Sequence, residues 1–293
     1  MVRNDTAALI EKLHAFGIDG AEKYLEEFDG STFVVKCGGA LLEDEAAGAL
    51  VLDDLALLSR AGVRTMLVHG GSVQADCDMA ESGIEPKRYK GLRITCDRTM
   101  EILERCFGAL NRRIVELLRE RGIEAVGFSG PENGGLLVAE KLHPDGVDIG
   151  RVGHVTDVRA QLLNALRRDA LPVVSSLGVD ADGCALNINA DYAATQLALR
   201  IGARKLILLT DVRGVLLDRN DPSSLISTLT CSHARKLIED KVIEAGMIPK
   251  IESAVGAVEA GLNKLHIVSG AAPHALAREL FTDEGCGTQI VKG

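Results

Sequence analysis

The sequence predicts an α/β protein in which a mainly parallel sheet lies between two layers of helices. Short runs rich in apolar, β-branched residues alternate with helical patterns along the chain, as they do in parallel α/β folds. Several of these runs are apolar at nearly every position, which indicates strands that are covered on both faces. Short glycine-rich turns join the elements. We therefore expect a three-layer αβα sandwich.

The individual elements follow from the same patterns. We expect strands at residues 32–36, 65–69, 125–129, 136–141, 171–175, 205–210, 265–268 and 288–291. Helical periodicity is clearest at residues 97–121, 193–201 and 251–260. Glycines at 134 and 135, followed by glycines at 150 and 153, predict a hairpin-like excursion in the middle of the chain, which would suit a lid.

The chain shows no low-complexity linker and no internal repeat. A boundary near residues 176–182 divides it into two expected lobes, residues 29–176 and residues 177–293. Ahead of them, residues 1–28 carry apolar side chains at helical spacing and form a helical arm. This arm either packs on its own domain or contacts a partner subunit, and the sequence favours neither arrangement.

Composition argues against several classes of protein. No apolar run approaches the ~20 residues that cross a bilayer, and the start of the chain lacks the apolar core of a signal peptide. A net charge of −9 and 3% aromatic residues argue against a nucleic-acid partner. The seven cysteines are odd in number and show no Cys-x-x-Cys spacing. We therefore expect reduced thiols in a cytosolic protein, without a metal centre of its own.

Two glycine turns follow consecutive predicted strands. Lys36 stands just before Gly38 and Gly39, and Gly70 and Gly71 follow the second strand and open a helix. Glycines at such turns let the backbone approach a phosphate, and a helix N-terminus favours an anion. Either turn alone would be an ordinary strand end. Together, at the sheet edge where α/β proteins bind ligands, they indicate a phosphate site.

Polar residues at three further turns are candidates for ligand binding. Arg93 precedes the helix at 97–121, and its guanidinium group suits a carboxylate. Asn187 and Asp191 precede an alanine-rich helix, where an N-cap at Asn189 or Asp191 is the simpler interpretation. Lys250 lies near a helix start, behind a proline, where a cation is locally unfavourable. That unfavourable position is a modest indication of function.

Taken in order, these motifs resemble the amino acid kinase family. The motifs are Lys36-x-Gly-Gly, His69-Gly-Gly, Gly91-Leu-Arg, Asn187-x-Asn-Ala-Asp, Thr210-Asp-Val-x-Gly and Gly246-Met-x-x-Lys. Each is weak alone, but six in sequence order are highly specific, and the likeness covers residues 30–293. A P-loop, the protein-kinase motifs and a dinucleotide fingerprint are missing from the sequence. Within the family, the chain resembles the branch that phosphorylates N-acetyl-L-glutamate.

The resemblance implies that the γ-phosphoryl group of ATP is transferred to the side-chain carboxylate of N-acetyl-L-glutamate. It also implies that Mg²⁺ accompanies the ATP and that the reaction belongs to arginine biosynthesis. It implies the amino acid kinase fold, with acyl substrate on the first lobe and ATP on the second. Lys36 and Lys250 would stabilise the transferring group, and Asp191 would orient both lysines. The acyl substrate would be held by Gly70, Gly71, Arg93 and Asn187. The nucleotide would contact Gly38, Gly39, Asp211, Val212, Arg213, Gly214, Val215, Leu216, Val242, Ile243 and Glu244.

The implied chemistry is physically coherent. A carboxylate of the glutamate type has a pKa near ~4.3 and is already ionised at neutral pH. The reaction therefore needs no general base, and the sequence offers no obvious one. Positioning and the neutralisation of negative charge remain, and two lysines, Mg²⁺ and glycine amides suit both tasks.

The arm and the C-terminal ending resemble those of arginine-inhibited members of the family. In those members an N-terminal helix links dimers into a hexamer, and arginine binds between that helix and the C-terminal segment. The implied contacts here are Tyr24, His274, Glu279 and Gly285. In the simpler interpretation, His274 caps the last helix and Glu279 is solvated. We expect a homodimer or a hexamer.

Some features depart from the family pattern. Ser72 stands where the second glycine turn usually has a third glycine, and Cys37 and Ala245 also replace other residues. Ser72 puts catalytic efficiency in question more than the fold. Residues 21–29 and 173–191 are similar to the kinase domain of bifunctional synthase/kinases, but we expect no acetyltransferase domain in this chain.

Two alternative functions stay open at this point. One is a kinase for another amino-acid carboxylate, of the aminoadipate or glutamate type. The other is a regulatory subunit that binds nucleotide and arginine with little turnover. The joint presence of Lys36, Asp191 and Lys250 argues against the second alternative.

Overall fold

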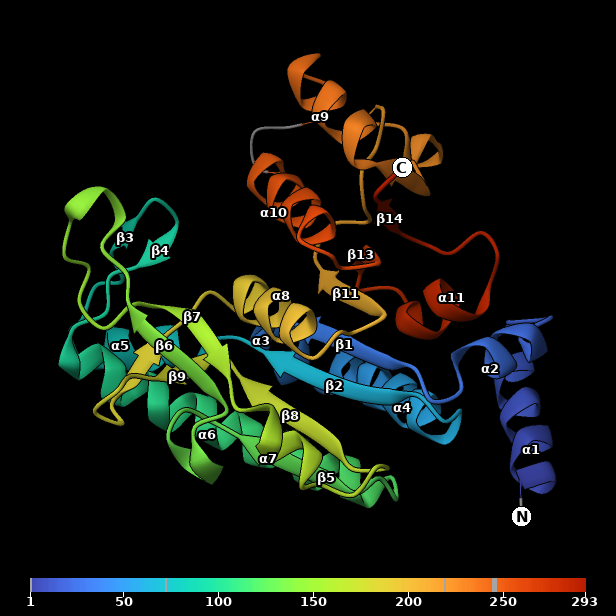
Figure 1. Cartoon of the computed structure of the whole chain (residues 1–293), viewed down its shortest axis with the longest axis horizontal. Helices are drawn as coiled ribbons and strands as arrows, with labels where there is room; N and C mark the ends of the chain where they lie inside the picture. Colours follow the sequence, from blue (N-terminus) through green and yellow to red (C-terminus); the bar gives the residue numbers. More distant parts are fainter. Residues whose placement is uncertain (1, 72, 219, 244–246) are drawn as a thin grey trace.

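A single eight-stranded sheet runs through the molecule (Figure 1), and the computed structural model describes residues 2–71, 73–218, 220–243 and 247–293. The strand order is β12-β14-β13-β11-β1-β2-β8-β5. Their bounds are β1 Thr32–Cys37, β2 Arg64–His69, β5 Ala125–Phe128, β8 Leu171–Ser175, β11 Lys205–Thr210, β12 Thr228–Thr230, β13 Lys264–Ser269 and β14 Thr288–Val291. Every neighbouring pair is parallel except β13 and β14. The predicted mainly parallel sheet is confirmed.

Helices cover both faces of this sheet. Their bounds are α3 Gly39–Glu43, α4 Glu45–Arg60, α5 Val73–Glu81, α6 Asp97–Glu120, α7 Ala160–Asn164, α8 Ala190–Arg200, α9 Cys231–Glu239, α10 Ile248–Glu259 and α11 Ala275–Phe281. Side chains of β1 alternate between two cores: Phe33 and Val35 pack with α4, α6 and α11, whereas Val34 packs with α8, α9 and α10. Because both faces are buried, the central strands are apolar throughout. The predicted αβα sandwich is confirmed.

A second, smaller sheet contains the central excursion. It has the order β10-β9-β6-β7, with β6 at Leu137–Lys141, β7 at Gly153–Val158, β9 at Leu177–Val179 and β10 at Ala185–Asn187. Strands β6 and β7 are antiparallel, so the expected hairpin is present, while its action as a lid stays a prediction. Because β9 pairs with β6, residues just after 176 lie with the first half of the chain. The lobe boundary at that residue also stays a prediction.

The sequence patterns missed the shortest strands. These are β9, β10 and β12, of three residues each, and the hairpin of β3 (Arg88–Tyr89) and β4 (Leu92–Arg93), of two residues each, whereas the six-residue β7 was expected only as part of the excursion. Two or three residues are too few to show the alternation of a half-buried strand, so pairing partners elsewhere in the chain decide their conformation. In the described ranges, helices long and apolar enough to cross a bilayer are absent.

The arm consists of α1 (Val2–Ala15) and α2 (Glu22–Phe28). Leu13, Ile18 and Phe28 are almost fully buried in the core on the α4 and α11 face of the sheet. The ring of Phe16 also stacks on His274, with ring centroids 3.5 Å apart. The arm therefore packs on its own domain. Contact with a partner subunit stays a prediction.

Candidate active site

Three elements bring two lysines to one carboxylate. The Nζ atom of Lys36, near the end of β1, lies 2.9 Å from Oδ1 of Asp191 in the first turn of α8. The Nζ atom of Lys250, in the first turn of α10, lies 3.9 Å from Oδ2 of the same aspartate. The three side chains are 13%, 22% and 28% exposed for Lys36, Lys250 and Asp191. The structure thus places together the three residues that were assigned catalytic roles.

The start of α8 leaves Asp191 available for this contact. Asn189 is the N-cap, and its side-chain oxygen accepts a hydrogen bond from the Tyr192 N–H at 3.0 Å. The capping interpretation therefore applies to Asn189 and not to Asp191. A carboxylate in the first helical turn is favoured by the helix dipole, whereas Lys250 is disfavoured in that position. The ion pair with Asp191 offsets the unfavourable position of Lys250.

The second glycine turn lies directly against the start of α8. A Cβ atom at Gly70 would stand 2.7 Å from the Cβ atom of Ala190, and one at Gly71 would stand 3.0 Å from the Phe107 ring. Any side chain at Gly70 would therefore push the turn away from Ala190, the neighbour of Asp191. Ser72, the departure from the family pattern, lies outside the described residues.

His69 and Cys37, at the ends of the two central strands, are both buried. Burial lowers the pKa of His69 to about 4, and its Nε2 atom lies 3.0 Å from Nδ2 of Asn111. His69 is therefore a neutral, hydrogen-bonded histidine at the end of a strand. Burial also raises the pKa of Cys37 to about 12, so its thiol stays protonated beside Lys36.

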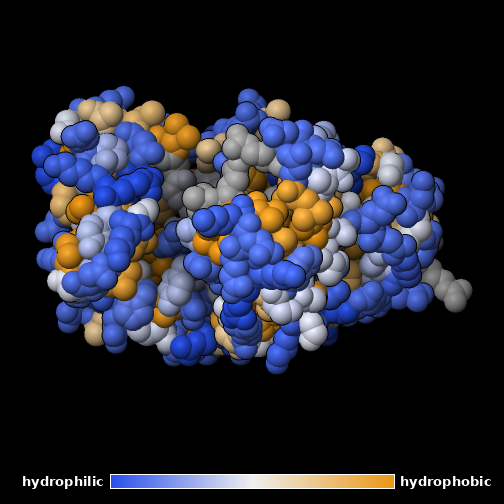
Figure 2. Space-filling view, turned by 90° about the horizontal axis from the view of Figure 1, so that it is seen from above, coloured by the Kyte–Doolittle hydropathy of each residue, from blue (hydrophilic) through white to orange (hydrophobic). Residues whose placement is uncertain are grey.

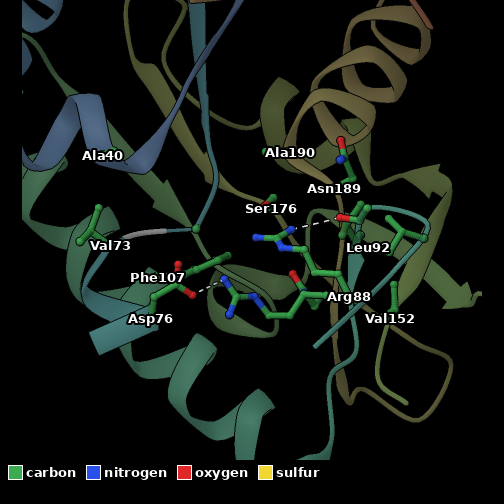
Figure 3. A pocket seen from close by; sticks show the side chains of 15 residues that line it. Ala40, Val73, Asp76, Arg88, Leu92, Phe107, Val152, Ser176, Asn189 and Ala190 are labelled. Carbon is green, nitrogen blue, oxygen red and sulfur yellow. Dashed lines mark hydrogen bonds and ion pairs between the residues drawn. The ribbon is translucent and has the colours of Figure 1, made fainter. Parts of the chain in front are cut away.

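A pocket of about 310 Å³ lies at the carboxyl end of the sheet (Figure 3), and its lining includes Gly71, Arg93 and Asn187. The Arg93 guanidinium donates to Asp76 Oδ1 at 2.5 Å. The amide nitrogen of Asn187 donates to Thr95 Oγ1 at 3.1 Å, which fixes this side chain. Three of the four residues assigned to the acyl substrate therefore share one pocket, and Gly70 packs behind it against Ala190.

A second hollow adjoins this pocket. It has a volume of about 610 Å³, and its lining includes Asp191, Lys250 and His154. Leu92 and Asn189 line both spaces, so the two lie side by side. Seen from above, the molecule is hollowed between the part that carries β3 and β4 and the part that carries α10 (Figure 2). The paired charges of Asp191 and Lys250 therefore border a continuous opening next to the pocket of Arg93 and Asn187.

Most residues assigned to the nucleotide line a third pocket, of about 620 Å³. They are Val212, Arg213, Gly214, Val215, Leu216, Val242 and Ile243, joined by Leu217, Asp218, Lys241 and Met247. The structure does not bring Gly38, Gly39 or Asp211 into the described lining: the first two form the turn between β1 and α3 beside Lys36. Glu244 lies outside the described residues. The pocket wall is largely apolar, which suits the flat faces of a nucleobase.

The backbone of this pocket is fixed at one glycine. Gly214 has φ of +134°, which favours glycine, and a Cβ atom there would stand 2.5 Å from Thr288 Oγ1. The same hydroxyl oxygen accepts a hydrogen bond from the Val215 N–H at 2.8 Å. The last strand thus holds the pocket loop in place.

The four residues implied for arginine binding lie near the arm and α11, each with an internal partner. Tyr24 donates from its hydroxyl to Asp283 Oδ1 at 2.5 Å. His274 occupies the N-cap position of α11, with Nδ1 2.7 Å from Asp54 Oδ1. The cap bond itself comes from Asp54, whose Oδ2 accepts from the Ala277 N–H at 3.2 Å. The expectation that the His274 side chain caps this helix is therefore wrong: the histidine holds the aspartate that does so.

The expectation that Glu279 is solvated is also wrong. Glu279 is 7% exposed, and its Oε1 lies 2.7 Å from His266 Nδ1. Its Oε2 accepts hydrogen bonds from the backbone N–H groups of Cys286 and Gly287, each at 2.8 Å. Gly285 allows this approach, because a Cβ atom there would stand 2.7 Å from Oε2. A buried carboxylate with this set of donors is satisfied without solvent.

In the part of the chain that the structure describes, no group of three histidine, cysteine, aspartate or glutamate side chains is arranged to hold a metal ion. The nearest carboxylate to the lysines, Asp191, is already paired with both of them. Mg²⁺ prefers oxygen ligands and often binds through substrate phosphates with few protein groups. That Mg²⁺ accompanies ATP at this site stays a prediction.

The comparisons with known proteins identify the family. The model described as "Amino acid kinase family" matches residues 31–269. The chain belongs to the amino acid kinase family. Members of this family are phosphotransferases, so the chain is a kinase, and the acetylglutamate kinase of Thermosynechococcus vestitus is 42% identical to it over 270 residues. That alignment covers 92% of this chain and 90% of the relative.

Two solved structures place the same fold within a longer protein. The N-acetylglutamate synthase of Neisseria gonorrhoeae, complexed with coenzyme A and N-acetyl-glutamate, matches with a TM-score of 0.83 and 28% identity, over 93% of this chain. The chain spans 62% of the length of that synthase. The same synthase complexed with coenzyme A and L-arginine matches with a TM-score of 0.79 and 27% identity, over 93% of this chain and 64% of the other.

The sequence reasoning missed several side chains that line the acyl pocket, above all Arg88, Asp76 and Ser176. One signal for Arg88 was present. Lys90 and Gly91 form a two-residue hairpin turn, in which both residues have positive φ, +47° and +81°. A glycine at the second position of such a turn is its usual sequence signal, and the turn places Arg88 across from Arg93. Asp76 and Ser176 gave no comparable signal, because only the tertiary fold brings them to the pocket.

Proposed function

We propose that this amino acid kinase transfers the γ-phosphoryl group of ATP to the side-chain carboxylate of N-acetyl-L-glutamate, a reaction of arginine biosynthesis. The observation that carries the proposal is the ion-paired set of Lys36, Asp191 and Lys250 beside the pocket of Arg93 and Asn187. Relatives at 42% identity that are named acetylglutamate kinase support the choice of substrate.

The acyl pocket offers what this substrate requires. Arg93 presents a guanidinium group for the carboxylate that is not phosphorylated. Asn187, fixed by Thr95, presents an amide group for the acetamide, and Gly71 brings backbone close to the substrate. The reacting carboxylate then extends toward Lys36.

The two lysines act on charge and not on protons. A carboxylate oxygen forms a bond to the γ-phosphorus while the bond between that phosphorus and the β,γ-bridging oxygen breaks, giving an acyl phosphate and ADP. Both lysines stabilise the negative charge on the phosphoryl oxygens and the leaving group, and Asp191 holds their Nζ atoms in position. No proton moves, because the attacking carboxylate is already ionised.

The pocket of Val212, Leu216 and Ile243 is proposed to hold the adenine and ribose. The triphosphate would then extend to the turn formed by Gly38 and Gly39 beside Lys36. Mg²⁺ would neutralise charge on the phosphates, which supply most of its ligands. We propose accordingly that residues 29–176 and 177–293 act as acyl-binding and nucleotide-binding lobes in a cytosolic enzyme.

An acyl-phosphate assay tests the function. With ATP, Mg²⁺ and N-acetyl-L-glutamate, the purified protein is expected to form a product that hydroxylamine traps as a hydroxamate, together with an equal amount of ADP. Glutamate and aminoadipate derivatives, assayed in parallel at equal concentration, should give kcat/KM at least about tenfold lower, since one changed contact is worth about 1–3 kcal/mol.

Two results would contradict this function. A preference for aminoadipate or glutamate would assign the chain to the alternative carboxylate kinases. Tight ATP binding without any acyl phosphate would favour the regulatory subunit with little turnover.

We also propose that arginine inhibits the enzyme by binding near α2 and α11, and that the protein forms a homodimer or a hexamer. The synthase that was solved with L-arginine supports the first part, and so does the position of Tyr24 beside the segment of Asp283 and Gly285. Millimolar L-arginine is expected to lower activity in the wild type and less in Tyr24→Ala. Lys236→Ala, which changes an exposed lysine of α9, is the control and should stay sensitive. A wild type unaffected by arginine would end this proposal.

A further inference from the structure

A two-stranded hairpin places two arginines opposite each other at the acyl pocket. Arg88 of β3 pairs directly with Arg93 of β4 in antiparallel register. Directly opposed residues have Cβ atoms about 5 Å apart and point to the same face of a hairpin. Both arginines line the acyl pocket, and Figure 3 shows the Arg88 side chain extending into it on the side of Ser176.

Asp145 anchors two further residues of the hairpin, Tyr89 and Lys90. Tyr89 donates from its hydroxyl to Asp145 Oδ2 at 3.0 Å, and Lys90 Nζ lies 2.6 Å from the same carboxylate oxygen. The Ile94 N–H donates to the Lys87 carbonyl oxygen at 2.9 Å, which extends the pairing of the hairpin. These contacts hold the hairpin, and with it Arg88, in position beside the pocket.

The two guanidinium groups differ in their partners. Arg93 forms an ion pair with Asp76 of α5, so its charge is balanced within the protein. Arg88 donates to the carbonyl oxygen of Gly91 in its own turn, at 3.0 Å, and has no carboxylate partner among the described residues. The face of the hairpin thus presents one uncompensated positive charge to the pocket. A carboxylate of a ligand is the natural counter-ion, since a guanidinium fork binds carboxylates in a bidentate manner.

We infer that Arg88 is a second carboxylate-binding residue, which with Arg93 selects a substrate whose non-reacting carboxylate is free and ionised. This inference rests on the proposed function. Of the two carboxylates of N-acetyl-L-glutamate, one goes to Lys36 for phosphorylation and the other faces the hairpin. An analogue in which that second carboxylate is an amide would leave Arg88 without its partner.

The test compares steady-state kinetics on N-acetyl-L-glutamate and on its α-amide, N-acetylisoglutamine. Arg88→Gln is expected to raise KM for N-acetyl-L-glutamate about 10–100-fold, as the loss of one charged hydrogen-bond partner implies. Its kcat and its KM for ATP should change less than about threefold, because Arg88 does not touch the phosphoryl group. Arg88→Lys, which keeps the charge without the fork, should recover part of the loss.

The preference for the acid over the amide separates carboxylate binding from a structural role of Arg88. A structural role would affect both substrates equally and leave this preference unchanged. Wild type should prefer the acid strongly, and Arg88→Gln should lose most of that preference. Lys87→Gln removes a positive charge from the neighbouring residue, which is exposed and outside the pocket lining, and should behave as wild type. An unchanged preference in Arg88→Gln, or a KM that rises equally for acid and amide, overturns the inference.

Failure of the proposed function would look different. In that case wild type itself makes no acyl phosphate from N-acetyl-L-glutamate. Calorimetric titration of wild type and Arg88→Gln with N-acetyl-L-glutamate then decides the matter: weaker binding by the variant supports the role of Arg88, and equal affinity, or no binding by either protein, overturns it.

Discussion

Lys36→Ala is expected to lower kcat about 10²–10³-fold, with changes of less than about fivefold in KM for either substrate. Its Nζ atom lies 2.9 Å from Asp191 Oδ1, and Asp191 also pairs with Lys250. A positive group that acts on charge developing in the transition state contributes mainly to kcat, and removal of one such group typically costs a factor of this size. Initial rates over a grid of both substrate concentrations separate the two parameters.

Lys250→Ala should behave in the same way, because Asp191 holds both lysines. The double variant should lose less activity than the product of the single losses, since residues that act as a unit are not additive. Lys236→Ala removes an exposed lysine of α9 and is the matched control. Turnover at the wild-type rate in either active-site variant would remove the catalytic assignment.

Glu279→Ala is expected to destabilise the protein by about 3 kcal/mol. Burial alone would raise the pKa of Glu279, but hydrogen bonds from His266 and from the backbone N–H groups of Cys286 and Gly287 hold that pKa below its usual value. Burial lowers the pKa of His266, so a neutral histidine donates from Nδ1 to an ionised glutamate. Removal of the carboxylate leaves three donors without a partner, two of them buried and one half-buried, which is among the costly kinds of substitution.

Urea denaturation of both proteins measures this effect as a shift in midpoint at unchanged slope. Glu284→Ala, five residues further on and exposed, is the control and should stay within about 0.5 kcal/mol of wild type. The pair Glu279→Ala and His266→Ala should be clearly non-additive, because the two side chains are in contact. A loss below about 1 kcal/mol for Glu279→Ala would show that the site repacks or admits water.

The fold was predictable where the residues of a single strand show the pattern of burial on both faces. Val34, Leu67 and Leu208 belong to runs that are apolar at almost every position, and the sheet order of β11, β1 and β2 is consistent with such burial. Strands β3 and β4 have two residues each and owe their pairing to the turn between them. A segment of two residues is too short to show a pattern from which this pairing could be predicted.

The candidate site was predictable through its motifs and not through its contacts. The roles of Lys36 and Asp191 followed from the resemblance, and the structure then brought the two side chains together. The burial of Glu279 was not predictable, because its partners lie on another strand and in a loop beyond its own helix. Arg88 was missed because it lies outside the Gly91-Leu-Arg motif, which contains only its partner across the hairpin, Arg93.

The register between β1 and β2 has a consequence for substrate length. The ladder pairs Lys36 with Val68 and Cys37 with His69, so the lysine turn and the glycine turn leave the sheet as immediate neighbours. Their separation is set by backbone hydrogen bonds at the usual strand spacing of about 4.8 Å, which side-chain motion cannot alter. An acid longer or shorter by one methylene therefore meets a lysine whose backbone position is fixed and whose Nζ atom is held at Asp191. We expect the sheet itself, and not only the pocket that surrounds the substrate, to limit which chain lengths react.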